Sequence, residues 1–180
     1  LFAGASLSAE RKAQVAAELA ALTGVAAQTW IRNDLRLDQA RFCRELLADQ
    51  GKVVGRLDSR YVGRNDDPQA ARASRDPSYD GPLGPFTVAV NEHLRRHIGY
   101  DDPKPYAIID LKVNEGWTDD RPWWQGAISV SDRLRKAMIA NPHMKVWVAN
   151  GLLDLGTPFF ASEYSVAHLG FEEELQANIV

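Results

Sequence analysis

Apolar residues near the start of the chain recur at spacings of three and four, which place them on one face of a helix. Val15, Leu19 and Leu22 form such a stripe, preceded by Ser8 and followed by Gly24. Serine caps the start of a helix by accepting a hydrogen bond from a free backbone N–H, and glycine adopts the left-handed conformation that ends one. The pattern therefore predicts a helix between Ser8 and Gly24.

The same spacing recurs in four later segments, each bounded by residues that start or stop helices. The predicted helices are 25–31, the residues from Asp38 to Gly51, 86–98 before Gly99, and the residues from Ser129 or Ser131 up to Asn141. A sixth helix is predicted from Pro158 to Leu169, because proline is favoured in a first helical turn.

Runs rich in β-branched and apolar residues predict strands between these helices. They are 53–61, 106–113 and 146–149. The segment 63–85 is instead rich in Asp, Arg, Gly, Pro and Ser, which predicts a long loop. A structureless segment of that length is typical of a lid or a binding loop. Alternation of helices with strands indicates the α/β class.

The composition bears on which classes of partner the sequence favours, but it does not identify a function. The hydrophobic fraction is 45% and the charged fraction 25%, as in ordinary globular domains. The net charge is 21 − 24 = −3, so no basic field favours a nucleic-acid partner. No apolar run is long enough to predict a membrane span.

The candidate for chemistry is Asp154, which lies in the loop 150–157 directly after the predicted strand 146–149. The carboxyl ends of strands are where ligands and catalytic groups gather in open α/β sheets. A carboxylate there can orient a catalytic histidine and stabilise its charged form. Aspartate in such a loop can equally form a turn or cap a helix. The spacing alone leaves both interpretations open.

The other side chains that could bind a metal or take part in catalysis have simpler structural interpretations. Cys43 lies in a helical pattern and is interpreted as a packed residue. His93 and His97 have the spacing of metal ligands but lack a third, and are interpreted as surface residues. His168 lies too far along the last predicted helix to act as the base for Asp154. The aromatic stretch 117–124 fits either a substrate channel or packing of a cap.

Four groups of residues resemble the bacterial branch of the serine carboxypeptidases, which are α/β-hydrolases with an inserted cap. The densest likeness is the segment 141–164, which contains Asn150-Gly151-Leu152-Leu153-Asp154-Leu155-Gly156-Thr157-Pro158. The likeness continues upstream in Val54-Gly55-Arg56-Leu57-Asp58-Ser59-Arg60-Tyr61, in Arg75-Asp76-Pro77-Ser78, and in Pro105-Tyr106. In that family the aspartate matching Asp154 belongs to the Ser-His-Asp triad.

The resemblance implies a fold and a division of the chain. The expected fold class is α/β, part of an α/β-hydrolase core preceded by a mostly helical cap. Residues 1–125 would form the cap, and residues 126–180 would be the part of the core that carries Asp154. The nucleophile elbow, Gly-x-Ser-x-Gly, does not occur in this sequence, and neither does a histidine motif after Asp154. The chain is therefore expected to be part of a larger enzyme and to be inactive alone.

The resemblance also implies a reaction and its partners. The parent would hydrolyse the C-terminal peptide bond of peptides, without metal or organic cofactor, in the periplasm or outside the cell. Expected partners are the peptide substrate and the remainder of the same protein, with oligomers possible through unpaired strand edges. Two alternatives remain: another hydrolase of the fold, such as an esterase or acyltransferase, and a non-catalytic binding module.

Overall fold

A computed structural model describes residues 6–67, 69–70, 75–117 and 129–180, which form two compact units. The first unit is Leu1–Gly84 with Leu153–Gly156, and the second is Pro85–Leu152 with Thr157–Val180. The predicted boundary between residues 125 and 126 lies outside the described residues, as does the aromatic stretch beyond Trp117.

In the described part of the first unit, the first three α-helices include two that have the predicted N-terminal caps. Helix α1 (Ala9–Thr23) starts at Ser8, whose side chain accepts a hydrogen bond from the N–H of Arg11, and ends at Gly24 with φ 81°. Helix α2 (Ala27–Arg32) follows. Helix α3 (Gln39–Glu45) starts at Asp38, which accepts from the N–H of Arg41. The first two helix predictions for this region are confirmed, whereas the third, from Asp38 to Gly51, is confirmed only as far as Glu45.

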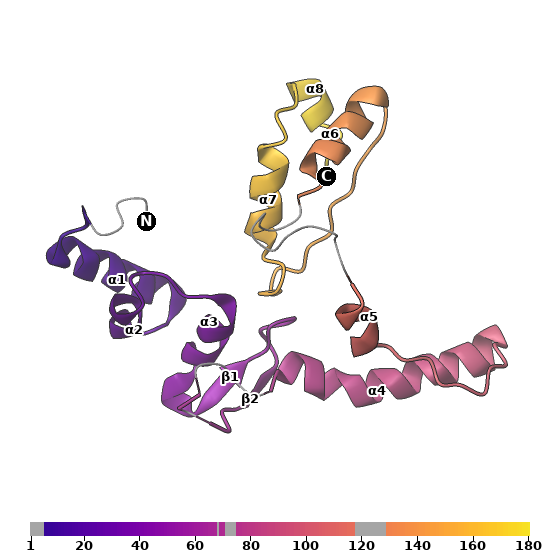
Figure 1. Cartoon of the computed structure of the whole chain (residues 1–180), viewed down its shortest axis with the longest axis horizontal. Coiled ribbons are helices and arrows are strands. Elements are labelled where there is room, and N and C mark those ends of the chain that lie inside the picture. The colour runs from indigo at the N-terminus through magenta and orange to yellow at the C-terminus, as the bar shows by residue number, and fades with distance from the viewer. Residues whose placement is uncertain (1–5, 68, 71–74, 118–128) are drawn as a thin grey trace. The chain divides into compact units, whose positions relative to one another are not determined.

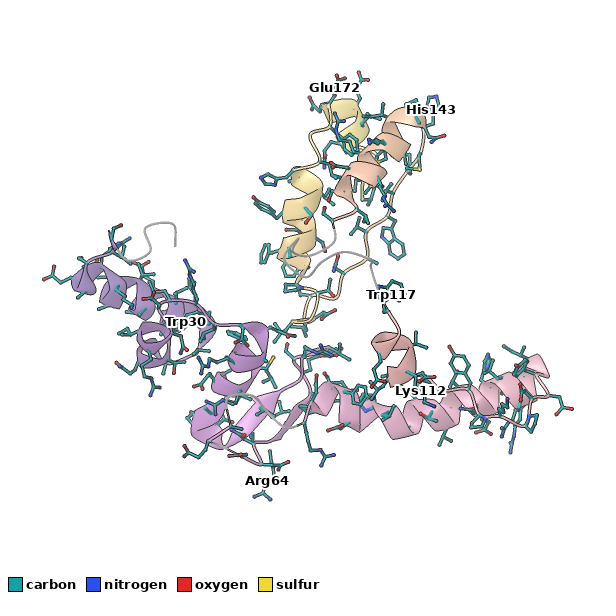
Figure 2. All side chains as sticks on the ribbon, viewed as in Figure 1. Trp30, Arg64, Lys112, Trp117, His143 and Glu172 are labelled. Carbon is teal, nitrogen blue, oxygen red and sulfur yellow. The ribbon has the colours of Figure 1, made fainter. Side chains whose placement is uncertain are left out.

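Helices α1 and α2 pack against each other and enclose a small hydrophobic core (Figure 1). Its buried members are Ala16, Val25, Trp30 and Leu35. Trp30 lies among the side chains of this helical region (Figure 2). Leu22, by contrast, is 83% exposed, so the last position of the predicted apolar stripe does not reach the core.

A two-stranded hairpin follows α3 and a short 3₁₀ helix, η2 (Ala48–Gln50). Strand β1 (Lys52–Val54) pairs antiparallel with β2 (Val62–Arg64), with Val53 opposite Gly63. The predicted strand 53–61 is therefore wrong beyond its first two residues. Residues 55–61 form the hairpin loop instead, because Gly55 N–H donates to the carbonyl of Tyr61 at 2.8 Å and closes the loop at its base.

Helix α4 (Pro77–His93) begins within the segment predicted as a long loop. That prediction is wrong for 77–85. The side chain of Asp76 accepts from the N–H of Ser78 and its carbonyl from the N–H groups of Tyr79 and Asp80, so a capped helix starts here. Helix α4 continues as a π-helical turn, η3 (Leu94–Ile98), which ends at Gly99 with φ 75°.

In the described part of the second unit, four further helices follow η3. They are α5 (Leu111–Glu115), α6 (Ser131–Ala140), α7 (Phe159–Ala167) and α8 (Glu173–Gln176). Met138 of α6 and Leu169 after α7 are buried. The predicted strand 106–113 is wrong, because Asp110 accepts from the N–H of Lys112 at 2.9 Å and thereby favours the start of α5.

The prediction of an α/β-hydrolase core is also wrong for this chain. About 51% of the chain is helical, and the sheet found among the described residues is the antiparallel pair β1 and β2 rather than a parallel sheet. The run 146–149 makes an isolated parallel bridge, Val146 to Ile179, in place of a strand within a sheet. A short apolar run needs neighbouring strands to become part of a sheet, and this pairing extends only from Val146 to Val148.

Among the described residues, no helix combines the length and the apolar character needed to cross a membrane. The corresponding expectation from the sequence is confirmed for that part of the chain.

Candidate functional site

Asp154 lies in a tight turn of the first unit, where its side chain is partly exposed. Its Oδ1 atom accepts a hydrogen bond from the N–H of Gly156 at 2.7 Å. The bond fixes the orientation of the carboxylate relative to its own backbone. A carboxylate held in this way is suited to receive a donor from another group in a defined direction.

The hairpin loop 55–61 holds the backbone on both sides of Asp154. The carbonyl of Arg56 accepts from the N–H groups of Leu155 and Gly156, each at 2.9 Å. On the other side, the N–H of Ser59 donates to the carbonyl of Leu153 at 3.0 Å. We call these three bonds the Asp154 clamp. They join two segments that lie far apart in the sequence.

An ion pair stiffens the loop that makes the clamp. The guanidinium of Arg60 donates to both carboxylate oxygens of Asp58, the closest approach being 2.6 Å, and the N–H of Arg60 donates to Oδ1 at 2.9 Å. The hydrogen bonds from Arg60 lower the pKa of Asp58. Asp58 therefore stays ionised near neutral pH and keeps its hold on this loop.

The side chains of Asp76 and Ser78, at the start of α4, accept hydrogen bonds from the backbone of the same loop. Asp76 Oδ1 accepts from the N–H of Arg56 at 3.2 Å, from the N–H of Ser78 at 2.9 Å and from the hydroxyl of Ser78 at 2.6 Å. Ser78 Oγ in turn accepts from the N–H of Leu57 at 2.9 Å. Ser78 is buried, with 6% of its surface exposed.

Gly55 is required by the close approach of the loop to α4. A Cβ atom at this position would lie 2.4 Å from Cβ of Ser78 and 2.6 Å from the carbonyl oxygen of Asp58. Both distances are far inside van der Waals contact, so a side chain would force the two segments apart.

The first unit contains no histidine, so its described residues hold no complete Ser-His-Asp triad by themselves. All four histidines of the chain, at positions 93, 97, 143 and 168, belong to the second unit. The hydroxyl of Ser78 is buried and donates to Asp76, so it is not placed as an exposed nucleophile. Asp154 thus offers the part of a triad that fixes the base, within the described residues of this unit.

His168 has its own partners within the second unit. Its Nδ1 atom lies 2.6 Å from the carbonyl of Tyr164, and its ring stacks on that of Tyr164 with centroids 3.8 Å apart. In a triad, Nδ1–H is the atom that donates to the aspartate. This geometry agrees with the interpretation of His168 as a residue other than the base.

The other candidate residues form no metal site in the described part of the chain. The rings of His93 and His97 stack with centroids 5.2 Å apart. No group of three or more His, Cys, Asp or Glu side chains that could hold a metal ion occurs among the described residues.

Cys43 is buried, and its burial raises the pKa of the thiol from an ordinary 9.0 to about 11, with a smaller contribution from the charge of Asp76. The folded state therefore holds the thiol proton more tightly than the unfolded state. The stability that this contributes is present below pH 9.0 and is lost as the pH rises toward about 11.

We expect the free energy of unfolding to fall between these pH values, and to fall less in Cys43→Ala. Urea unfolding of both proteins across this window measures the difference. Because lysines and tyrosines titrate in the same range, only the difference between the two proteins reports on Cys43. Identical pH dependence in both would contradict the expectation.

The sequence predicted a loop around Asp154, and the structure has one. Asp76 and Ser78 were also predicted to lie in a loop, so their support of the Asp154 turn was missed. The signal was present in Asp76-Pro77-Ser78, an aspartate followed by proline at the first helical position. The contact between this helix start and the hairpin loop joins segments about twenty residues apart, so no local sequence pattern predicted it.

Comparisons of the chain with protein-family models, with curated proteins and with solved structures found no match.

Proposed function

We propose that this chain supplies the triad aspartate, Asp154, of a serine carboxypeptidase. The observation that carries the proposal is the convergence of three segments that resemble that family. The hairpin loop, the start of α4 and the turn around Asp154 are separated in sequence, yet they share one hydrogen-bonded network in the first unit. Chance likeness of short segments gives no reason for them to meet around the one residue expected to be catalytic.

In the proposed reaction, Asp154 accepts the Nδ1–H of a histidine and fixes its tautomer. The histidine then takes the proton of a serine hydroxyl as the oxygen attacks the carbonyl of the last peptide bond, and later returns the proton to the leaving amine. The carboxylate stabilises the imidazolium while charge develops. The serine and the base belong, in this proposal, to polypeptide beyond these 180 residues, because no Gly-x-Ser-x-Gly elbow is present.

The proposal names two partners: a peptide with a free C-terminus and the remaining part of the enzyme. Several large apolar side chains of the second unit are exposed, including Trp147 at 80% and Phe160 at 69%. These residues are suited to contact further polypeptide or a second copy of the chain.

The first test uses the 180-residue chain alone. We expect no release of the C-terminal residue from N-blocked dipeptides, because the sequence contains no Gly-x-Ser-x-Gly elbow to supply the nucleophile. Chromatography of the products measures this. Turnover by the purified chain that disappears in Asp154→Ala would show that the whole triad lies within these residues.

The second test uses the protein encoded by the complete gene. An N-blocked dipeptide, its C-terminal amide and the matching ethyl ester are compared at equal concentration. A carboxypeptidase releases the last residue of the free acid faster than it cleaves the amide. Cleavage of the ester alone would indicate an esterase instead of a carboxypeptidase. Cleavage of none of the three substrates would favour a non-catalytic binding module.

A further inference from the structure

We propose that Ser78 and Asp76 are positioning residues for Asp154, acting through the peptide group that joins Arg56 to Leu57. The consequence for catalysis rests on the proposed function, whereas the mechanical coupling is a property of this chain alone. The coupling links three segments of the first unit, and neither Ser78 nor Asp76 would touch the substrate.

The first step is the planarity of the peptide group between residues 56 and 57. Its N–H belongs to Leu57 and donates to Ser78 Oγ at 2.9 Å. Its carbonyl belongs to Arg56 and accepts from Leu155 and Gly156, both at 2.9 Å. Because the group is planar and rigid, its two ends cannot rotate independently. The bond to Ser78 therefore fixes the direction in which the carbonyl meets the turn around Asp154.

The second step is the shared N–H of Gly156. This single donor lies 2.9 Å from the carbonyl oxygen of Arg56 and 2.7 Å from Oδ1 of Asp154. The two acceptors share one proton, so a movement of the Arg56 carbonyl changes how strongly the N–H binds the carboxylate. A rotation of the 56–57 peptide is thereby transmitted to the orientation of Asp154.

The third step is the role of Asp76, which fixes the hydroxyl of Ser78 and the preceding peptide group, between Gly55 and Arg56. Its Oδ1 atom accepts the hydroxyl of Ser78 at 2.6 Å and the N–H of Arg56 at 3.2 Å. Since the Ser78 hydroxyl donates to Asp76, its lone pairs face the N–H of Leu57. Each bond in the series polarises the next, and this strengthens a hydrogen-bonded chain in a partly buried site.

Amide hydrogen exchange on the 180-residue chain tests the coupling directly. We expect the amides of Leu155 and Gly156 to exchange about tenfold faster in Ser78→Ala. The loss of one buried hydrogen bond should raise the equilibrium constant for local opening by about that factor. The matched control is Ser59→Ala. Ser59 lies in the same loop, but its contribution to the clamp is its backbone N–H, which alanine keeps.

A pair of substitutions at Asp76 separates positioning from general stability. Asp76→Asn retains an oxygen that can accept the same donors, whereas Asp76→Ala removes it. We expect Asn to keep most of the protection of Leu155 and Gly156 and Ala to lose it, while the amides of α1 remain unchanged in both. The ¹³C chemical shift of the Asp154 carboxyl group should move with the protection.

Unchanged exchange at Leu155 and Gly156 in a folded Ser78→Ala protein would overturn the proposal, as would absence of protection there in the native chain. Should Ser78→Ala fail to fold, the native protection and the two Asp76 variants decide. Within the active enzyme, Ser78→Ala should reduce kcat by about 10²-fold with KM unchanged. Exchange data do not depend on activity, so a failure of the proposed function leaves this test intact.

Discussion

Replacement of Asp154 by asparagine is expected to reduce kcat by about 10⁴-fold in the proposed serine carboxypeptidase, as the equivalent change does in serine proteases. Asparagine has nearly the size of aspartate and retains an oxygen that can accept the N–H of Gly156. The turn should therefore survive. The amide lacks the charge that stabilises an imidazolium, and its NH₂ group favours the wrong histidine tautomer.

The loss should appear in kcat rather than in KM, because the carboxylate matters most when charge develops on the base. Steady-state kinetics with a blocked dipeptide measure it, and circular dichroism establishes folding. Asp38→Asn is the matched control, since asparagine caps α3 as well as aspartate does. A folded Asp154→Asn enzyme with nearly normal kcat would reduce Asp154 to a turn-forming residue.

The helices of the first unit could be predicted because their signals are local. Ser8 and Asp38 each cap a helix through a bond to the backbone three residues later, and Gly24 ends α1 in the left-handed conformation. All these interactions lie within a few residues in the sequence. The apolar spacing between them adds the buried face.

The strands could not be predicted in the same way, because their stability depends on partners distant in the sequence. The run 146–149 has the composition of a buried strand, but its pairing is confined to the last residues of the chain. At 106–113 the apolar run was outweighed by the capping bond of Asp110 to Lys112. The fold class inferred from these two runs was accordingly wrong.

In the candidate site, too, features with local sequence signals could be predicted and features that depend on distant segments could not. The position of Asp154 in a turn followed from the glycines and the proline around it. Its clamp depends on Arg56, Ser59 and the start of α4, which no periodicity connects. The family resemblance named these segments, whereas only the structure shows that they share hydrogen bonds.

The second large effect is expected for Gly55→Ala. The added Cβ would lie 2.4 Å from Cβ of Ser78 and 2.6 Å from the carbonyl oxygen of Asp58, and neither atom is the movable end of a flexible side chain. The hairpin loop must therefore move away from α4. We expect the free energy of unfolding to fall by about 1–3 kcal/mol, the usual cost of forcing extra volume into a packed region.

The matched control is Gly84→Ala, because a Cβ at Gly84 meets no atom within 4 Å. Alanine is favoured over glycine within a helix such as α4 by roughly 0.5–1 kcal/mol, but Gly84 precedes Pro85, whose ring disfavours helical backbone in a residue that carries a Cβ. The two effects oppose each other, so Gly84→Ala should change the free energy of unfolding by less than about 1 kcal/mol. The same chemical substitution is thus expected to have a large effect at Gly55 and a small one at Gly84. Urea unfolding followed by circular dichroism measures both midpoints.

Gly55→Ala should also release the Asp154 clamp, since the displaced loop carries the carbonyl of Arg56 and the N–H of Ser59. Exchange of the Leu155 and Gly156 amides should therefore accelerate in this variant and remain unchanged in Gly84→Ala. A Gly55→Ala protein with native stability and native protection at these amides would mean that the loop does not approach α4 as closely as 2.4 Å implies. Both predicted effects of Gly55→Ala would then fail together, because each depends on that one close approach.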